Sequence, residues 1–115
     1  MMLAILPKEE DMIHKQRSYE DDVVRVTFEL PTAIGGEQVH LVGDFNAWNQ
    51  NDMPMHRNGN GTWQVTLPLQ KGRDFQFRYL VDGERWYNDW DADSYVPNPY
   101  GGKNSVVTTR PDRLA

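Results

Sequence analysis

Two segments of the sequence place a tryptophan among small polar residues at the end of an alternating, apolar stretch. They are residues 43–48, GDFNAW, and residues 81–86, VDGERW. A tryptophan on a polar surface is costly to leave in water unless the indole covers an apolar neighbour or binds something flat. A pyranose ring has an apolar C–H face that packs on an indole, and its hydroxyls require hydrogen-bond partners. Two such tryptophans, with amides and one arginine nearby, indicate a platform for a sugar ring.

The composition limits the partners that such a platform could serve. The formal net charge of −5 argues against nucleic acid, because a phosphate backbone selects a basic surface, and against anionic membrane surfaces. No apolar run is long enough to span a bilayer, so we expect no membrane association. Cysteine is absent, which excludes disulfides and thiolate chemistry. Its absence fits a reducing compartment, and we expect a cytoplasmic protein.

Patterns for catalysis and metal binding are weak. Asp89, Asp91 and Asp93 alternate as in the first half of a calcium-binding loop. Ser94, however, stands where that loop needs glycine, and Tyr100 stands where it needs a bidentate glutamate. The three histidines lack zinc-site spacing, and the sequence contains no nucleophile elbow or phosphate-binding loop. We therefore expect a solvated acidic loop, no metal, no cofactor and no catalytic activity.

The elements that must position the two tryptophans are predicted to be β-strands. Apolar and polar residues alternate along 24–30, 63–69 and 75–81, which indicates strands with one buried face. The dipeptide Asp82-Gly83 marks a tight hairpin, because glycine supplies the positive φ that such a turn needs. No segment of useful length shows helical periodicity. The expected strands are 24–30, 38–44, 63–69, 75–81, 85–88 and 104–109, with an edge strand within 13–19.

About seven short strands at regular spacing are typical of an all-β, immunoglobulin-like β-sandwich. A chain of 115 residues is long enough for one domain with a single core. We expect this domain at 21–110, preceded by an N-terminal arm at 1–20 and followed by a C-terminal tail at 111–115. The predicted core comprises Val26, Phe28, Leu41, Trp63, Val65, Leu67, Phe77, Tyr79 and Val106.

The order of these motifs resembles the glycogen-binding module family, also called carbohydrate-binding module family forty-eight. The similar segments are 39–48 (VHLVGDFNAW), 61–63 (GTW), 75–83 (FQFRYLVDG) and 104–107 (NSVV). The family includes the β-subunit of AMP-activated protein kinase, and its early-set domain precedes the catalytic domains of isoamylases and branching enzymes. The resemblance implies an early-set sandwich that binds α-1,4-glucans such as glycogen, starch or maltodextrin. It also implies a glycogen- or starch-metabolising enzyme as a candidate protein partner.

The resemblance implies five carbohydrate-binding residues. The two stacking tryptophans of the family fall on Trp48 and Trp86. Its basic residue in the strand before Asp-Gly falls on Arg78, and its asparagine before the final hydrophobic pair falls on Asn104. The loop residue that packs against the sugar chain falls near Tyr100. Two features depart from the family pattern: the turn before the second tryptophan has one extra residue, and arginine replaces the lysine of the kinase subunit.

Each of these residues also has a structural interpretation. Trp48 could cover the open end of the sandwich, and Trp86 could pack over its own hairpin. Arg78 could pair with a surface carboxylate, which would contribute little stability. Asn104 could bond to the preceding turn, and Tyr100 is ambiguous. The alternative function is therefore a protein-interaction or self-associating domain that keeps the aromatic signature without binding sugar.

Overall fold

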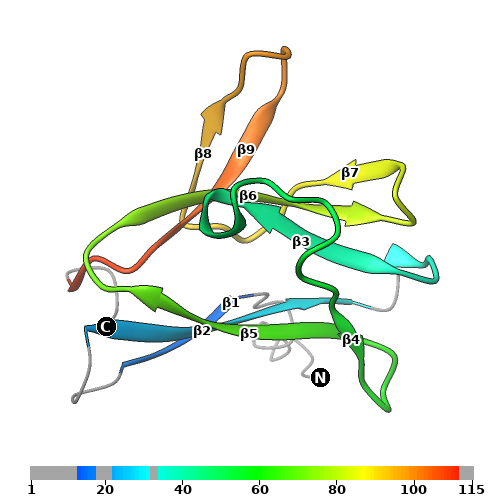
Figure 1. Ribbon diagram of the computed structural model, residues 1–115, viewed down its shortest axis with the longest axis horizontal. Coiled ribbons are helices and arrows are strands. Elements are labelled where there is room, and N and C mark those ends of the chain that lie inside the picture. The colour runs from blue at the N-terminus through cyan, green and yellow to red at the C-terminus, as the bar shows by residue number, and fades with distance from the viewer. Residues whose placement is uncertain (1–12, 18–21, 32–33, 112–115) are drawn as a thin grey trace, which may run out of the picture.

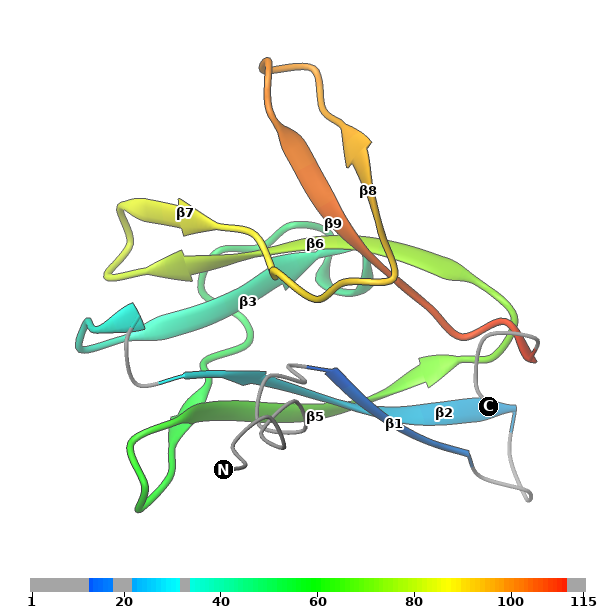
Figure 2. The same cartoon turned by 180° about the vertical axis from the view of Figure 1, so that it is seen from behind.

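The structure is a computed structural model that describes residues 13–17, 22–31 and 34–111. Two antiparallel sheets face each other as the layers of a sandwich (Figure 1, Figure 2). The first sheet has the order β1-β2-β5-β4, with β1 at Ile13–Arg17, β2 at Val23–Leu30, β5 at Trp63–Gln70 and β4 at His56–Arg57. The second sheet has the order β3-β6-β9-β8, with β3 at Val39–Gly43, β6 at Asp74–Val81, β9 at Lys103–Thr108 and β8 at Ser94–Pro97. A fifth strand of this sheet, β7 (Arg85–Tyr87), pairs with β6. The predicted immunoglobulin-like β-sandwich is confirmed.

The register of β2 against β5 explains why their alternating sequences form one buried face. Val26 lies opposite Leu67 and Phe28 lies opposite Val65, so the apolar residues of both strands point to the same side. Pro68 lies within β5 but beyond the two residues that pair with β4. Proline cannot donate to a ladder, and at this position β2 is the only strand of the described residues that pairs with β5.

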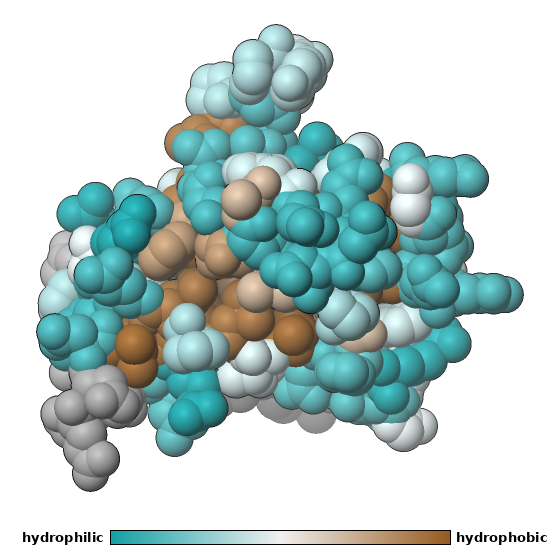
Figure 3. Space-filling view, viewed as in Figure 1, coloured by the Kyte–Doolittle hydropathy of each residue, from teal (hydrophilic) through white to brown (hydrophobic). Residues whose placement is uncertain are grey.

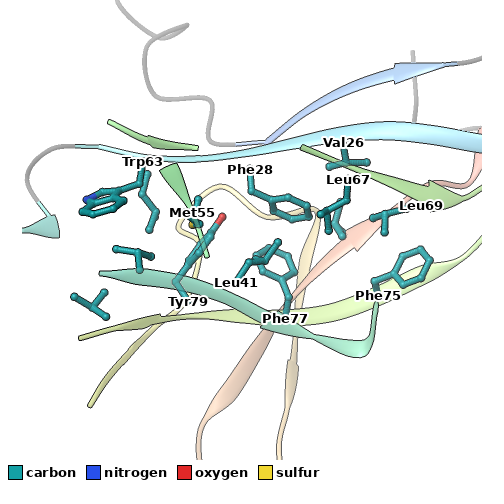
Figure 4. Close-up of a cluster of buried hydrophobic side chains, with 14 of the residues drawn as sticks. Val26, Phe28, Leu41, Met55, Trp63, Leu67, Leu69, Phe75, Phe77 and Tyr79 are labelled. Atoms are coloured by element: carbon teal, nitrogen blue, oxygen red, sulfur yellow. The ribbon is translucent and has the colours of Figure 1, made fainter. Parts of the chain in front are cut away.

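The core lies between the sheets and is rich in aromatic rings (Figure 4). Phe77 contacts Phe28 and Tyr79 with edge-on rings, at centroid distances of 5.1 and 5.6 Å. Trp63 and Phe75 close the two ends of the cluster drawn in Figure 4. Seven predicted core residues are confirmed in the buried cluster, and an eighth, Val65, packs against it while half-buried. The seven are Val26, Phe28, Leu41, Trp63, Leu67, Phe77 and Tyr79.

The prediction that Val106 belongs to this core was wrong, because the alternate residues of β9 face the core. Val107 pairs with Phe75 and joins the core cluster, whereas Val106 pairs with Gln76 and is buried on the outer face of the second sheet. The residues from Asn104 to Thr109 are all buried. With no exposed residue in alternate positions, the sequence carries no signal for which face is inward.

The remaining differences lie in short elements. Neither β4 nor β8 was predicted, because two residues are too few for a pattern and β8 ends in a proline-rich turn. The strand expected to reach Asp44 ends at Gly43, where a 3-10 turn, η3 (Asp44–Asn46), begins. The expected edge strand is β1, which pairs with β2. Residues 1–12 of the expected arm and 112–115 of the expected tail lie outside the described residues.

The acidic run between β7 and β8 is only in part the solvated loop expected from the sequence, because Asp91 is exposed whereas Asp89 is buried. Asp89 is only 1% exposed, and it accepts hydrogen bonds from the Tyr79 hydroxyl at 2.8 Å and the Asp91 backbone N–H at 2.7 Å. Asp93 pairs with Lys15 of β1 at 2.7 Å. These carboxylates therefore fasten the connection to both sheets. No helix among the described residues is long and apolar enough to cross a membrane.

Candidate functional site

A cleft of about 590 Å³ lies on the outer face of the second sheet. It is built from three places: the loop after η3, the outer face of β6 and β7, and the β8–β9 hairpin, which projects from the sheet (Figure 1, orange). All five residues predicted from the sequence line this one cleft. The complete lining is Trp48, Gln50, Gln76, Arg78, Trp86, Asn98, Pro99, Tyr100 and Asn104.

The cleft is positioned by a change of partners along β6. Residues 74–77 of β6 pair with β9, and residues 79–81 pair with β7. Arg78 therefore lies where the two partner strands diverge, with Gln76 two residues before it on the same face. The divergence places Trp86 of β7 on one side of the cleft and Asn104 of β9 on the other.

Trp48 is held by a tight turn whose backbone is left-handed at two consecutive residues. Ala47 has φ 56° and Trp48 has φ 58°, and the Trp48 N–H donates to the Gly43 carbonyl at 2.9 Å. Gly43 has no room for a side chain, because a Cβ there would lie 2.5 Å from the Gln76 carbonyl oxygen. Phe45 turns toward the core and packs against it, whereas Trp48 lies outside the core cluster and lines the cleft.

Trp86 and Arg78 form a neighbouring pair on the outer face. Trp86 lies opposite Leu80 and is 37% exposed, in the middle of β7, the short strand that follows the Asp82-Gly83 turn. Asp82 and Gly83 have φ values of 54° and 71°, which confirms the predicted hairpin turn. The Arg78 guanidinium carbon lies 5.8 Å from the centre of the Trp86 ring. Among the described residues no carboxylate lies within 4.0 Å of Arg78, so the alternative of a surface ion pair is not seen.

A chain of side-chain amides forms the floor and far wall. Asn98 Nδ2 donates to Asn104 Oδ1 at 3.2 Å, and Asn104 Nδ2 donates to Gln76 Oε1 at 3.0 Å. The side-chain oxygen Oδ1 of Asn98 also accepts a hydrogen bond from the backbone N–H of Tyr100, at 2.9 Å, and so shapes the hairpin tip. Asn104 thus bonds to the preceding turn, as one interpretation expected, and also lines the cleft at 9% exposure. Tyr100 is 92% exposed at the tip.

Four lining residues were missed in the sequence. Gln76 could have been found, because it shares the polar face of its strand with Arg78. Asn98 and Pro99 looked like turn residues, and their place beside the cleft depends on the unpredicted strand β8. Nothing in the sequence around Gln50 distinguishes it from other polar loop residues.

The chemistry that the cleft offers is binding. Its lining contains indoles, amides, one phenol and one guanidinium, but no carboxylate and no histidine. It therefore lacks the facing carboxylates of a glycosidase. No group of three or more acidic or histidine side chains within residues 13–17, 22–31 and 34–111 is placed to hold a metal ion.

Comparisons with known proteins agree with this description. The 5'-AMP-activated protein kinase subunit beta-1 of Sus scrofa is 28% identical over 108 residues, which cover 90% of this chain and 84% of that protein. The same subunit of Pongo abelii is 28% identical over 108 residues, covering 90% of this chain but 38% of that protein. The 1,4-alpha-glucan-branching enzyme of Aspergillus oryzae is 49% identical over 42 residues, covering 36% of this chain and 6% of that protein.

A family model also matches most of the chain. It describes the glycogen recognition site of AMP-activated protein kinase, and it matches residues 24–114. The match covers the second sheet, the first sheet apart from β1 and the first residue of β2, and every residue that lines the cleft. The chain therefore belongs to the family of the glycogen recognition site of AMP-activated protein kinase.

Proposed function

We propose that this domain binds α-1,4-glucans such as glycogen, starch or maltodextrin in the cleft, with Trp48 and Trp86 as its stacking platform. The observation that carries the proposal is the convergence on one surface cleft of the five residues that the family resemblance implies. They come from four segments of the chain, and the cleft contains no catalytic carboxylate. The family match supports the same class of ligand.

Each lining residue has a distinct role in this proposal. The two indoles cover the apolar C–H faces of glucose rings. Arg78 and the second N–H of the Asn104 amide meet hydroxyl groups, because an asparagine amide has two N–H donors and only one of them bonds to another described residue. Tyr100 packs against the sugar chain from the tip of the hairpin. A curved glucan matches walls that rise on either side of β6.

The expected affinity is modest. Two indole faces covered by sugar remove about 150–250 Å² of apolar surface from water. This burial contributes roughly 4–6 kcal/mol of binding free energy before the cost of association is subtracted. Hydrogen bonds to hydroxyls add little because they replace bonds to water, and association subtracts several kcal/mol. The net corresponds to dissociation constants of roughly tens of micromolar to millimolar for a short oligosaccharide. A branched polymer would bind with higher apparent affinity through many contacts.

The proposal is tested by titrating maltoheptaose or β-cyclodextrin while following tryptophan fluorescence and amide NMR shifts. Trp48→Ala and Trp86→Ala should each weaken binding without unfolding the domain. Trp90→Ala is the matched control, because Trp90 is 56% exposed and lies outside the cleft. A folded parent protein that shows no response at millimolar ligand would contradict the proposal.

A protein partner is the second candidate function. The relatives are a kinase subunit and a branching enzyme, which supports a glycogen- or starch-metabolising enzyme as the partner. Figure 3 shows apolar surface gathered between the two sheets, beside β5 and β6 and below the projecting β8–β9 hairpin in this view. Retardation in a native gel that contains glycogen separates the candidates, because only the sugar-binding function predicts it.

A further inference from the structure

The cleft carries a single formal charge, the guanidinium of Arg78, although the whole chain has a net charge of −5. The other eight lining residues are neutral. In the part of the chain that the structure describes, Arg78 has no carboxylate within 4.0 Å, and its Nε is buried without a hydrogen-bond partner. The lining therefore presents a guanidinium that forms no ion pair with the described residues; the carboxylate of Asp44, placed at the cleft, is instead occupied by hydrogen bonds from Trp48 Nε1 and the Gln76 N–H.

A neutral sugar is an incomplete partner for such a cation. A glucan lying over Trp86 would displace water from the guanidinium nearby and offer only neutral hydroxyl oxygens in return. A phosphate monoester carries about −1.5 to −2 charges at neutral pH and has three acceptor oxygens. A guanidinium binds such a group in a bidentate manner, which lysine cannot do.

Gln76 adds a second donor beside Arg78. The side-chain oxygen Oε1 of Gln76 accepts the hydrogen bond from Asn104. The side-chain nitrogen Nε2 of Gln76 is therefore the last group in the row of bonded amides. No hydrogen bond from this Nε2 to another described residue is present. Gln76 and Arg78 lie two residues apart on the same face of β6 and both line the cleft. The floor thus presents adjacent donors, an arrangement that suits an anionic oxygen cluster.

We propose that the cleft prefers α-glucan chains bearing a phosphate monoester over unmodified chains, with Arg78 and Gln76 receiving the phosphate. This inference rests on the proposed glucan-binding function. The phosphate would lie beside the ring that stacks on Trp86, because the guanidinium is next to that indole. The indoles supply affinity for the chain, and the two donors supply selectivity for its modification.

The test compares maltoheptaose with a monophosphorylated maltoheptaose by calorimetry, using the whole chain. We expect about tenfold tighter binding of the phosphorylated chain, because charge-assisted hydrogen bonds are stronger than neutral ones. That preference should shrink as salt is raised. Arg78→Gln should bring the affinity ratio close to one. Arg85→Gln is the matched control, since Arg85 is exposed on the same hairpin but pairs with Asp82 outside the cleft.

The outcomes separate the two proposals. Equal binding of both oligosaccharides by the parent protein would overturn the phosphate preference and leave glucan binding intact. No binding of either by the folded protein would overturn glucan binding itself. Inorganic phosphate serves as a further probe: if it binds as tightly as the phosphorylated chain, the site is a simple anion site and the proposal is wrong. If Arg78→Gln does not fold, Arg78→Lys should retain the fold and keep only part of the preference.

Discussion

The carboxylate of Asp44 fixes the indole of Trp48 through a hydrogen bond of 2.9 Å from Nε1 to Oδ1. Its other oxygen accepts the backbone N–H of Gln76 at 2.7 Å. One side chain therefore joins the turn that carries a stacking residue to the strand that forms the floor of the cleft. An indole that is already oriented loses less entropy when a ligand covers it.

Asp44→Asn should weaken glucan binding several-fold while the domain stays folded. An amide can offer one oxygen, so one of the two N–H groups would face an NH₂ donor instead of an acceptor. The expected loss is roughly threefold to tenfold, because only orientation is affected and both indoles remain. Calorimetry with maltoheptaose measures the affinity, and hydrogen exchange of the Trp48 indole proton reports its bond. Asp52→Asn, at an exposed site, is the control; unchanged affinity and exchange in Asp44→Asn would refute the positioning role.

The tryptophans and Arg78 could be predicted because strand alternation and turn chemistry are local. Trp86 follows a turn that requires glycine, and Arg78 lies on the polar face of a regular strand. Asn98 could not be predicted, because its contact with Asn104 depends on the pairing of β8 with β9. Val106 shows the same limit: β9 is buried on both faces, so local alternation gives no phase.

Phe77→Ala should destabilise the domain by about 3–5 kcal/mol. Phe77 is fully buried and its ring contacts those of Phe28, Phe45 and Tyr79, so truncation leaves a cavity at the centre of the core. Urea denaturation measures the loss, with Phe77→Leu expected to cost less because it keeps most of the volume. A loss under about 1 kcal/mol would be incompatible with the described strand phase.

Gly83→Val should lower the melting temperature and also weaken glucan binding. Gly83 has φ +71°, and a Cβ there would meet no atom within 4 Å, so the cost is backbone strain rather than collision. The strained turn directly precedes β7 and would displace Trp86. Gly59→Val is the matched control, because Gly59 also has open space but lacks a positive φ. Thermal melts followed by circular dichroism should show a larger decrease for Gly83→Val; equal decreases would exclude strain at the turn.

Asp89 should give the domain a component of stability that declines as pH rises. Burial raises the pKa of Asp89 above its ordinary value of 3.8, and hydrogen bonds from Tyr79 and the Asp91 N–H only partly oppose this. The folded state then holds the proton more tightly than the unfolded chain. The contribution is fully present below about pH 3.8 and is lost as pH rises through the folded pKa.

The pKa of Asp82 is shifted in the opposite direction, so its contribution to stability has the opposite pH dependence. A variant of Asp89 separates the two contributions. Backbone hydrogen bonds from Glu37 and Gln38 lower the pKa of Asp82, so its contribution is lost as pH falls through the folded value. The Asp89→Asn variant lacks the titration of Asp89 and keeps the titration of Asp82. Relative to the parent, its free energy of unfolding should therefore rise as pH increases above 3.8, whatever constant offset the new amide introduces. Urea denaturation between about pH 3.5 and 7 measures this difference, with Asp52→Asn as the control. A difference that stays flat across this range would show that Asp89 has the same pKa in both states, despite its burial.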